Sequence, residues 1–391
     1  MAGRQGETMR DVVIIGIGQT AVGEHWDRSI RDLAAEAIAK ARADAGVERA
    51  DVLYVGNMAS GALCGQENLG TLVGDAAGLL PIEAVKIEAA CASGGAAVRA
   101  AWLAVAGGTH DYALAVGVEK MTDLLTDGVT SALATAADAD YEAGHGVSFV
   151  ALNAMLMRRY MHEHGARREE FAPLAVLAHA NAAHNPHALY RQPITAAEFA
   201  ASPLVADPIG ILDSAAICDG AAAVLLAPAS EARRVRRPAV RIAASTCVTD
   251  TVGLAQRRDP LVWEAVGAGA RRAYTEAKVG PRDIDLFELH DAFTIVSALA
   301  LEACGFADRG HALKLAAEGR LARDGDLPIC TLGGLKGRGH PVGASGAYQI
   351  VEVAQQLRGE AGAAQVKGAR TGMAQSVGGS GSVAVTHILQ V

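Results

Sequence analysis

Short apolar segments alternate with longer amphipathic or small-residue segments along the first third of the chain. Segments 11–16, 51–56 and 112–119 are continuous apolar runs, the pattern of strands that are buried on both faces. Between them, segment 29–45 has the periodicity of an amphipathic helix, and segment 91–107 is typical of a helix rich in small residues. This alternation predicts an α/β fold with a mainly parallel sheet that helices cover on both faces.

The same order of elements returns in the last third of the chain. Strands are predicted at 240–245, 284–289 and 382–389, and helices at 262–277 and 343–358. A similarity that recurs after roughly 250 residues indicates two duplicated α/β halves and excludes a short-period solenoid.

The two small-residue helices correspond best between the halves. Cys91-Ala-Ser-Gly matches Gly343-Ala-Ser-Gly, and about three turns of helix follow each of them. Small side chains would let these helices pack closely, face to face, at the centre of the molecule.

The region between the halves has a different composition. Residues 179–187 gather His, Asn and Pro, but they lie on a polar segment and do not favour a metal site. We therefore predict three domains: an N-terminal half at 1–120, an inserted loop-rich, substrate-binding domain at 121–238, and a C-terminal half at 239–391.

Composition and charge exclude several classes of function. The chain has 391 residues, a net charge of −8 and no long basic run, so nucleic acid and anionic membrane surfaces are poor partners. Its six cysteines form no CxxC pair, which favours a reducing compartment over disulfides or a zinc site. The polar N-terminus and the lack of a membrane-length apolar run predict a soluble cytoplasmic protein.

Cys91 is the strongest candidate for chemistry, because it lies where a strand is followed by a helix. At such a junction the helix dipole and free backbone N–H groups favour a thiolate and can stabilise an oxyanion. A buried, inert cysteine in a small-residue helix is the alternative.

Two histidines far along the chain favour a reactive Cys91 over an inert one. His290 ends the strand predicted at 284–289, and His340 lies among glycines directly before Pro341. The repeat places His340 just before the helix that pairs with the Cys91 helix, so the duplication brings all three residues toward one site. A cysteine beside a histidine base is the arrangement of an activated thiol nucleophile.

These residues carry a resemblance to the thiolase superfamily. The Cys91 segment, the box 290–293 (HDAF), the box 339–341 (GHP) and the glycine-rich segment 378–381 occur in the order and spacing of that family, over nearly the whole chain. The box at His290 resembles the branch of sterol-carrier-protein-type and archaeal acetyl-CoA acetyltransferases. The resemblance implies duplicated βαβαβαββ halves in a five-layer α-β-α-β-α sandwich, coenzyme A thioester substrates, and a homodimer or homotetramer.

The resemblance also implies roles for single residues. Cys91 would take the acyl group as a thioester, and His340 would deprotonate Cys91 and help to hold the thioester oxygen. His290 would hold that oxygen too, directly or through a water. The N–H groups of Cys91 and Gly378 would form a second oxyanion hole. No metal and no cofactor is expected, since coenzyme A is a substrate.

Departures from the family pattern leave the acid/base for the α-carbon proton open. Ser376 and Ala292 stand where thiolases carry a second cysteine, and a serine hydroxyl is a poor proton shuttle near neutral pH. His290 is the favoured base, and Cys330 and Cys64 are weaker options.

Other features leave substrate and reaction open. Arg158, Arg159 and Arg191 are weak candidates for contacts with the coenzyme A phosphates and could equally be solvated. The acyl chain length is not readable from the sequence. Alternatives to a thiolase are a thiolase-like aldolase acting with a small zinc-ribbon/OB-fold partner, a decarboxylating ketoacyl synthase, and a non-catalytic subunit that binds coenzyme A or lipid. The aldolases of this type carry tyrosines at the positions of the two histidines.

Overall fold

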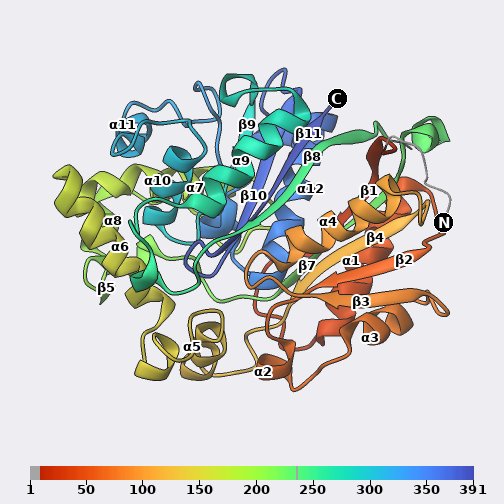
Figure 1. Cartoon of the computed structure of the whole chain (residues 1–391), viewed down its shortest axis with the longest axis horizontal. Helices are drawn as coiled ribbons and strands as arrows, with labels where there is room; N and C mark the ends of the chain where they lie inside the picture. Colours follow the sequence, from red (N-terminus) through yellow and green to blue (C-terminus); the bar gives the residue numbers. More distant parts are fainter. Residues whose placement is uncertain (1–8, 235–236) are drawn as a thin grey trace, which may run out of the picture.

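The computed structural model describes residues 9–234 and 237–391 (Figure 1). The N-terminal half contains β1 (Val12–Gln19), α1 (Ile30–Ala45), β2 (Val52–Gly56), α2 (Ser60–Cys64), α3 (Leu69–Ala76), β3 (Glu83–Ile87), α4 (Ser93–Ala106), β4 (Ala113–Glu119) and β7 (Gly220–Pro228). The C-terminal half contains β8 (Val240–Thr249), α9 (Glu264–Ala277), β9 (Leu286–Glu288), α10 (Thr294–Ala303), α11 (Ala312–Ala317), α12 (Ser345–Arg358), β10 (Thr371–Gly378) and β11 (Val383–Gln390).

A helical region lies between β4 and β7 in the chain. It holds α5 (Thr126–Ala134), α6 (Phe149–His164), α7 (Ala172–Ala182), α8 (Ala196–Ala201) and the small hairpin of β5 (Leu204–Ala206) and β6 (Ile209–Gly210). It packs against the C-terminal half, where α6 and α7 contact α10. The predicted boundaries at 120/121 and 238/239 remain a prediction.

The strands of both halves join into one sheet within the described part of the chain, in the order β3-β2-β4-β7-β1-β8-β11-β10-β9. Only the pairs β2–β3, β2–β4 and β9–β10 are parallel, and the others are antiparallel. The predicted mainly parallel sheet is therefore wrong. A short turn joins β10 to β11, which requires antiparallel pairing, and β7 enters between β4 and β1 in the opposite direction.

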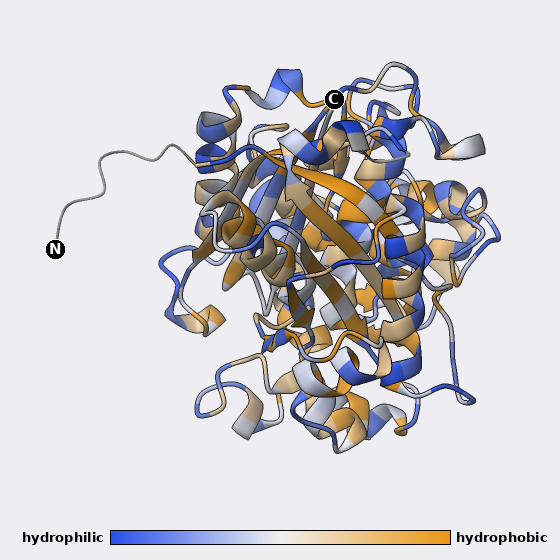
Figure 2. Ribbon diagram, turned by 90° about the vertical axis from the view of Figure 1, so that its right-hand side faces the viewer, coloured by the Kyte–Doolittle hydropathy of each residue, from blue (hydrophilic) through white to orange (hydrophobic). Residues whose placement is uncertain are grey.

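The predicted five-layer order is confirmed. Helix α1 covers the outer face of β1 and β7, α4 and α12 lie between the two halves, and α9 covers the outer face of β8 and β11. Figure 2 shows the apolar strands at the centre of the molecule and most hydrophilic segments on its outer parts. No helix of the described residues is long and apolar enough to cross a membrane.

The central helices pack as closely as their small residues predict. A Cβ added at Gly94 would lie 2.7 Å from the carbonyl oxygen of Gly343, and one at Gly346 would lie 2.4 Å from the backbone nitrogen of Gly95. Only glycine permits this approach of two helix backbones. The consequence for function is that the beginnings of α4 and α12, with Cys91 and His340 just before them, are held side by side.

Candidate active site

Cys91 lies in a tight turn between β3 and α4. The preceding residue, Ala90, has a φ of 50°, the left-handed region that a residue with a Cβ rarely adopts. The Ser93 hydroxyl holds the turn, since it accepts from the N–H of Ala89 at 2.9 Å and donates to the carbonyl of Ala90 at 2.6 Å. The helix begins at Ser93, two residues later than predicted, and the turn presents the half-buried sulfur to a cavity.

The structure brings Cys91, His290 and His340 together. The sulfur and one nitrogen of each imidazole lie within 4.8 Å of one another, and the two rings meet edge to face with centroids 5.1 Å apart. All three residues line one cavity of about 250 Å³, whose other walls are largely apolar. The spatial convergence predicted from the duplication is thus present.

Ser345 is the buried partner of His340 Nδ1, although the sequence did not single it out. His340 Nδ1 lies 2.7 Å from the Ser345 hydroxyl, which also lies 3.1 Å from the carbonyl oxygen of Pro341. With its one proton directed to Pro341, the hydroxyl can accept from Nδ1–H. In that tautomer His340 Nε2 is unprotonated and available as a base.

Burial dominates the electrostatics of the three groups. It raises the pKa of Cys91 to about 12, with a further increase from Glu119, while the backbone N–H groups of Cys91 and Gly379 act in the opposite direction. The expectation that the helix start keeps Cys91 as a thiolate is therefore wrong for the free protein, because removing the charge from water costs more than the N–H groups return. The thiol needs a base to react.

Both histidines are neutral in this setting. Burial, with a smaller effect of Arg338, lowers the pKa of His290 to about 3. Burial also lowers the pKa of His340 well below its usual value, and His290 and Arg338 lower it further. A neutral imidazole can accept a proton from Cys91, whereas an imidazolium could not.

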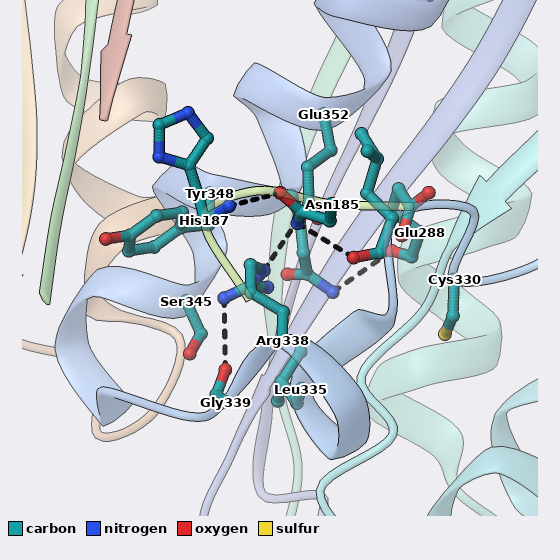
Figure 3. A network of polar contacts seen from close by, with 12 residues as sticks. Asn185, His187, Glu288, Cys330, Leu335, Arg338, Gly339, Ser345, Tyr348 and Glu352 are labelled. Carbon is teal, nitrogen blue, oxygen red and sulfur yellow. Dashed lines mark hydrogen bonds and ion pairs between the residues drawn. The ribbon is translucent and has the colours of Figure 1, made fainter. Parts of the chain in front are cut away.

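Buried polar contacts fix the glycine-rich turn that carries His340. The Asp291 carboxylate accepts from the N–H groups of Leu335 and Lys336 at 2.6 and 3.3 Å, which ties this turn to the residue after His290. Arg338 lies between Glu352, at 2.7 Å, and the carbonyl of Gly339, at 3.1 Å (Figure 3). These contacts join the residue after His290 to the turn that carries His340, so one hydrogen-bonded network positions both imidazoles.

The glycine-rich segment after β10 borders the sulfur. The N–H of Gly379 acts on the Cys91 sulfur, and the role of the Gly378 N–H toward a thioester oxygen stays a prediction. Because side chains alternate along a strand, Val377 lines the cavity and Ser376 faces the other way. A Cβ at Gly95 would lie 2.4 Å from the Ser376 hydroxyl, which places this serine between the central helices.

Among the candidate acid/base groups, only His290 reaches the cavity. Cys330 is buried beside Asp291, and its pKa lies well above the usual value because of burial. Cys64 donates to the carbonyl of Lys120 at 3.4 Å, and burial raises its pKa to about 11. Ala292 does line the cavity but carries no acid or base.

The three candidate arginines lie away from Cys91. Arg158 pairs with Asp207, and Arg159 with Glu163, on the exposed side of α6. Arg191 lines a second cavity, which shares Val150, Val205 and residues 214–216 with the first. Of these three arginines, only Arg191 lines a cavity that shares wall residues with the catalytic one.

Comparisons with known proteins agree with this geometry. The chain is 47% identical to the acetyl-CoA acetyltransferase of Methanothermobacter thermautotrophicus, over 97% of this chain and 99% of that protein. It is 31% identical to human sterol carrier protein 2, over 97% of this chain and 72% of that protein. A solved structure titled Ltp2-ChsH2(DUF35) aldolase matches with a TM-score of 0.86 and 26% identity, over 99% of both chains.

Family models cover most of the chain. The thiolase N-terminal domain matches residues 12–230, and the thiolase C-terminal domain-like model matches residues 247–391. Together with the relatives and the shared cavity, these matches show that the protein is an acyltransferase belonging to the thiolase family.

Proposed function

We propose that the protein cleaves and forms 3-oxoacyl-CoA thioesters through an acyl group carried on Cys91. The observation that carries this proposal is the meeting of the Cys91 sulfur with two neutral imidazoles in one cavity of a thiolase. A relative with 47% identity is an acetyl-CoA acetyltransferase, which supports acetyl-CoA as one product of cleavage.

The first step of cleavage follows from the geometry. His340 Nε2 takes the proton of the Cys91 thiol as the sulfur attacks the 3-oxo carbon. The Ser345 hydroxyl, which accepts from Nδ1–H, stabilises the imidazolium that forms. We assign the oxygen that gains negative charge to the backbone N–H groups of Cys91 and Gly378, the pair that the family resemblance implies.

The second step breaks the bond between the α- and β-carbons. The electron pair moves onto the α-carbon of the departing acetyl-CoA, and the acyl group stays on Cys91. The α-carbon takes the proton that His340 gained from Cys91, and we assign its transfer to His290, whose ring lies against that of His340, since Val377 and Ala292 supply no acid or base at the cavity wall. The thiol of coenzyme A then attacks the acyl-Cys91 thioester, its proton passes through His340 to the departing Cys91 sulfur, and the shortened acyl-CoA is released. No metal or cofactor enters this scheme, in which coenzyme A is a substrate.

The decisive experiment is mass spectrometry of the protein after incubation with acetyl-CoA. One acetyl group replacing one hydrogen on the Cys91 peptide, a gain of about 42 Da, is expected, with loss of thiolysis activity in Cys91→Ala. Cys247→Ala is the matched control, because Cys247 is an exposed cysteine outside the cavity. Acetylation elsewhere, or full activity in Cys91→Ala, would overturn the proposal.

Two features favour testing an aldolase with a partner as the second candidate. A structural neighbour is titled as an aldolase together with ChsH2(DUF35), and the sequence resemblance implies a zinc-ribbon/OB-fold partner for such proteins. His290 and His340, in place of tyrosines, favour the thiolase reaction. Incubation with a 3-hydroxyacyl-CoA and detection of the released carbonyl compound distinguishes the two.

Assembly and location are part of the same proposal. Strand β3 ends the sheet of the described residues, and its Val85 is 43% exposed, which supports pairing with a second copy in a homodimer or homotetramer. Light scattering after size-exclusion chromatography measures that state. A cytoplasmic location and contacts of Arg191 with the coenzyme A phosphates remain proposals as well.

A further inference from the structure

A second cavity lies beside the catalytic one and has a different character. Its volume is about 680 Å³, and it shares Val150, Val205 and residues 214–216 with the cavity of Cys91. Its polar lining comes from α7, from the segment around Tyr190 and from the glycine-rich turn before His340. Nothing in the thiolysis scheme uses these polar groups.

The distinctive group in this cavity is the ammonium of Lys336. Lys336 is only 2% exposed, and its Nζ donates to His179 Nε2 at 3.2 Å. His179 is neutral, since burial and the nearby Lys336 lower its pKa to about 4. Burial lowers the pKa of Lys336 to about 8, which leaves the ammonium as its main form at pH 7, and Asp291 and Asp213 oppose this shift only from farther away. Within residues 9–234 and 237–391, no carboxylate lies within ion-pair distance of Nζ.

The nearby carboxylates are already engaged. Asp291 accepts from backbone N–H groups of the glycine-rich turn, and Asp213 accepts from Arg168, Thr294 and a backbone N–H. An ammonium has three protons to donate, so two remain for a ligand in the cavity. A buried cation that lacks a counter-charge favours binding of an anion.

The scaffold holds this group rigidly. The N–H of Lys336 donates to Asp291, and the N–H of Tyr190 donates to the carbonyl of Gly337 at 3.1 Å, which joins two walls of the cavity. The His179 ring stacks on Tyr190 with centroids 5.5 Å apart. Arg191 is exposed at the same cavity, so positive charge lies both at its surface and at its buried end.

We propose that Lys336 and His179 form a carboxylate-binding subsite for 3-oxoacyl-CoA substrates whose acyl chain ends in a second carboxyl group. This rests on the proposed function and defines a substrate class for it. A free carboxylate matches a single buried ammonium in a cavity that shares five wall residues with that of Cys91. A coenzyme A phosphate carries more charge and stronger hydration, which suits exposed cations such as Arg191 better.

Kinetics with two matched substrates test the proposal. We compare thiolysis of 3-oxoadipyl-CoA, which ends in a carboxylate, with that of 3-oxohexanoyl-CoA, which has the same chain length and no charge. In Lys336→Met the ratio of their kcat/KM values is expected to fall about tenfold or more, mainly through the KM of the charged substrate. Lys314→Met, which removes an exposed lysine on α11, is the control and is expected to keep the ratio.

The outcomes that would overturn the proposal are distinct. A ratio that changes less than about threefold in Lys336→Met excludes a carboxylate subsite. An equal rise in the KM for coenzyme A with both substrates would assign Lys336 to a coenzyme A phosphate instead. Methionine keeps the apolar stem and removes a charge that has no counter-charge, so the variant is expected to fold, which its thermal midpoint verifies.

A binding measurement separates this proposal from the proposed function. Isothermal titration of Cys91→Ala with adipyl-CoA and hexanoyl-CoA requires no turnover, and the charged ligand is expected to bind about tenfold more tightly only where Lys336 is present. Absence of thiolysis by the unaltered protein, with this preference retained, would contradict the proposed function alone. Equal binding of both ligands would contradict the subsite.

Discussion

Replacing Ser345 with alanine is expected to slow thiolysis, because the change removes the acceptor of the His340 Nδ1–H. That bond is 2.7 Å long and buried, and truncation to a methyl group removes its acceptor. A buried donor that loses its partner costs about 1–3 kcal/mol. The cost is larger when His340 has become an imidazolium than when it is neutral, so it raises the barrier to attack by Cys91. At about 1.4 kcal/mol for each factor of ten, kcat is expected to fall roughly 5- to 150-fold.

The assay is steady-state thiolysis of acetoacetyl-CoA, with kcat and KM determined separately. Ser376→Ala is the matched control, since it removes another buried serine hydroxyl that lies between the central helices and does not face the cavity. It is expected to change kcat less than about threefold. Equal losses in both variants, or an unchanged kcat in Ser345→Ala with an intact thermal midpoint, would refute the role of Ser345 in holding His340.

Three further predictions concern protonation and packing. With the pKa of Cys91 at about 12, iodoacetamide labelling of the free protein is expected to accelerate about tenfold per pH unit from pH 7 to 9, and a plateau in the labelling rate would contradict this. Because burial holds the pKa of His340 well below its usual value, kcat/KM is expected to show no acid limb near pH 6.5, and such a limb in the pH profile would count against a neutral base. Gly94→Ala is expected to lower the free energy of unfolding in urea by roughly 1–3 kcal/mol, whereas Gly128→Ala, whose Cβ would meet nothing closer than 3.5 Å, is expected to leave it unchanged or raised.

The layered architecture was predictable because its causes are local. Ser29 begins α1 with a capping box and Gly46 ends it, as the residue types indicate. The pairing of α4 with α12 follows from small residues at matching places in two halves. Strand directions were not predictable in the same way, because they depend on β7, whose alanine-rich segment 220–228 has low strand propensity and is fully buried between two neighbours.

The candidate active site was likewise predictable only in part. Residue types and a repeat were sufficient to bring Cys91, His290 and His340 together. The protonation state of the Cys91 thiol was not predictable in this way. The helix dipole, which the sequence indicates, favours the thiolate, whereas burial raises the pKa of the thiol and is known only from the three-dimensional packing. The N–H of Gly379, which acts on the sulfur, was not identified from the sequence, because the turn after β10 decides which amide faces the sulfur.

Lys336 and His340 belong to one turn, and that turn serves two cavities. In the sequence, Lys336 resembles an ordinary charged residue in a glycine-rich loop, and His179 lies in a polar segment that favours no site. Folding buries both and leaves the ammonium with a neutral imidazole as its polar partner among the described residues. Asp291, adjacent to His290, accepts from two backbone N–H groups of this turn and forms no ion pair with the Lys336 ammonium. The Asp291 carboxylate therefore fixes the turn that carries His340, the base that faces Cys91, and leaves Lys336 in the neighbouring cavity without an ion-pair partner. The proposed chemistry and the proposed substrate preference thus depend on the same structural support.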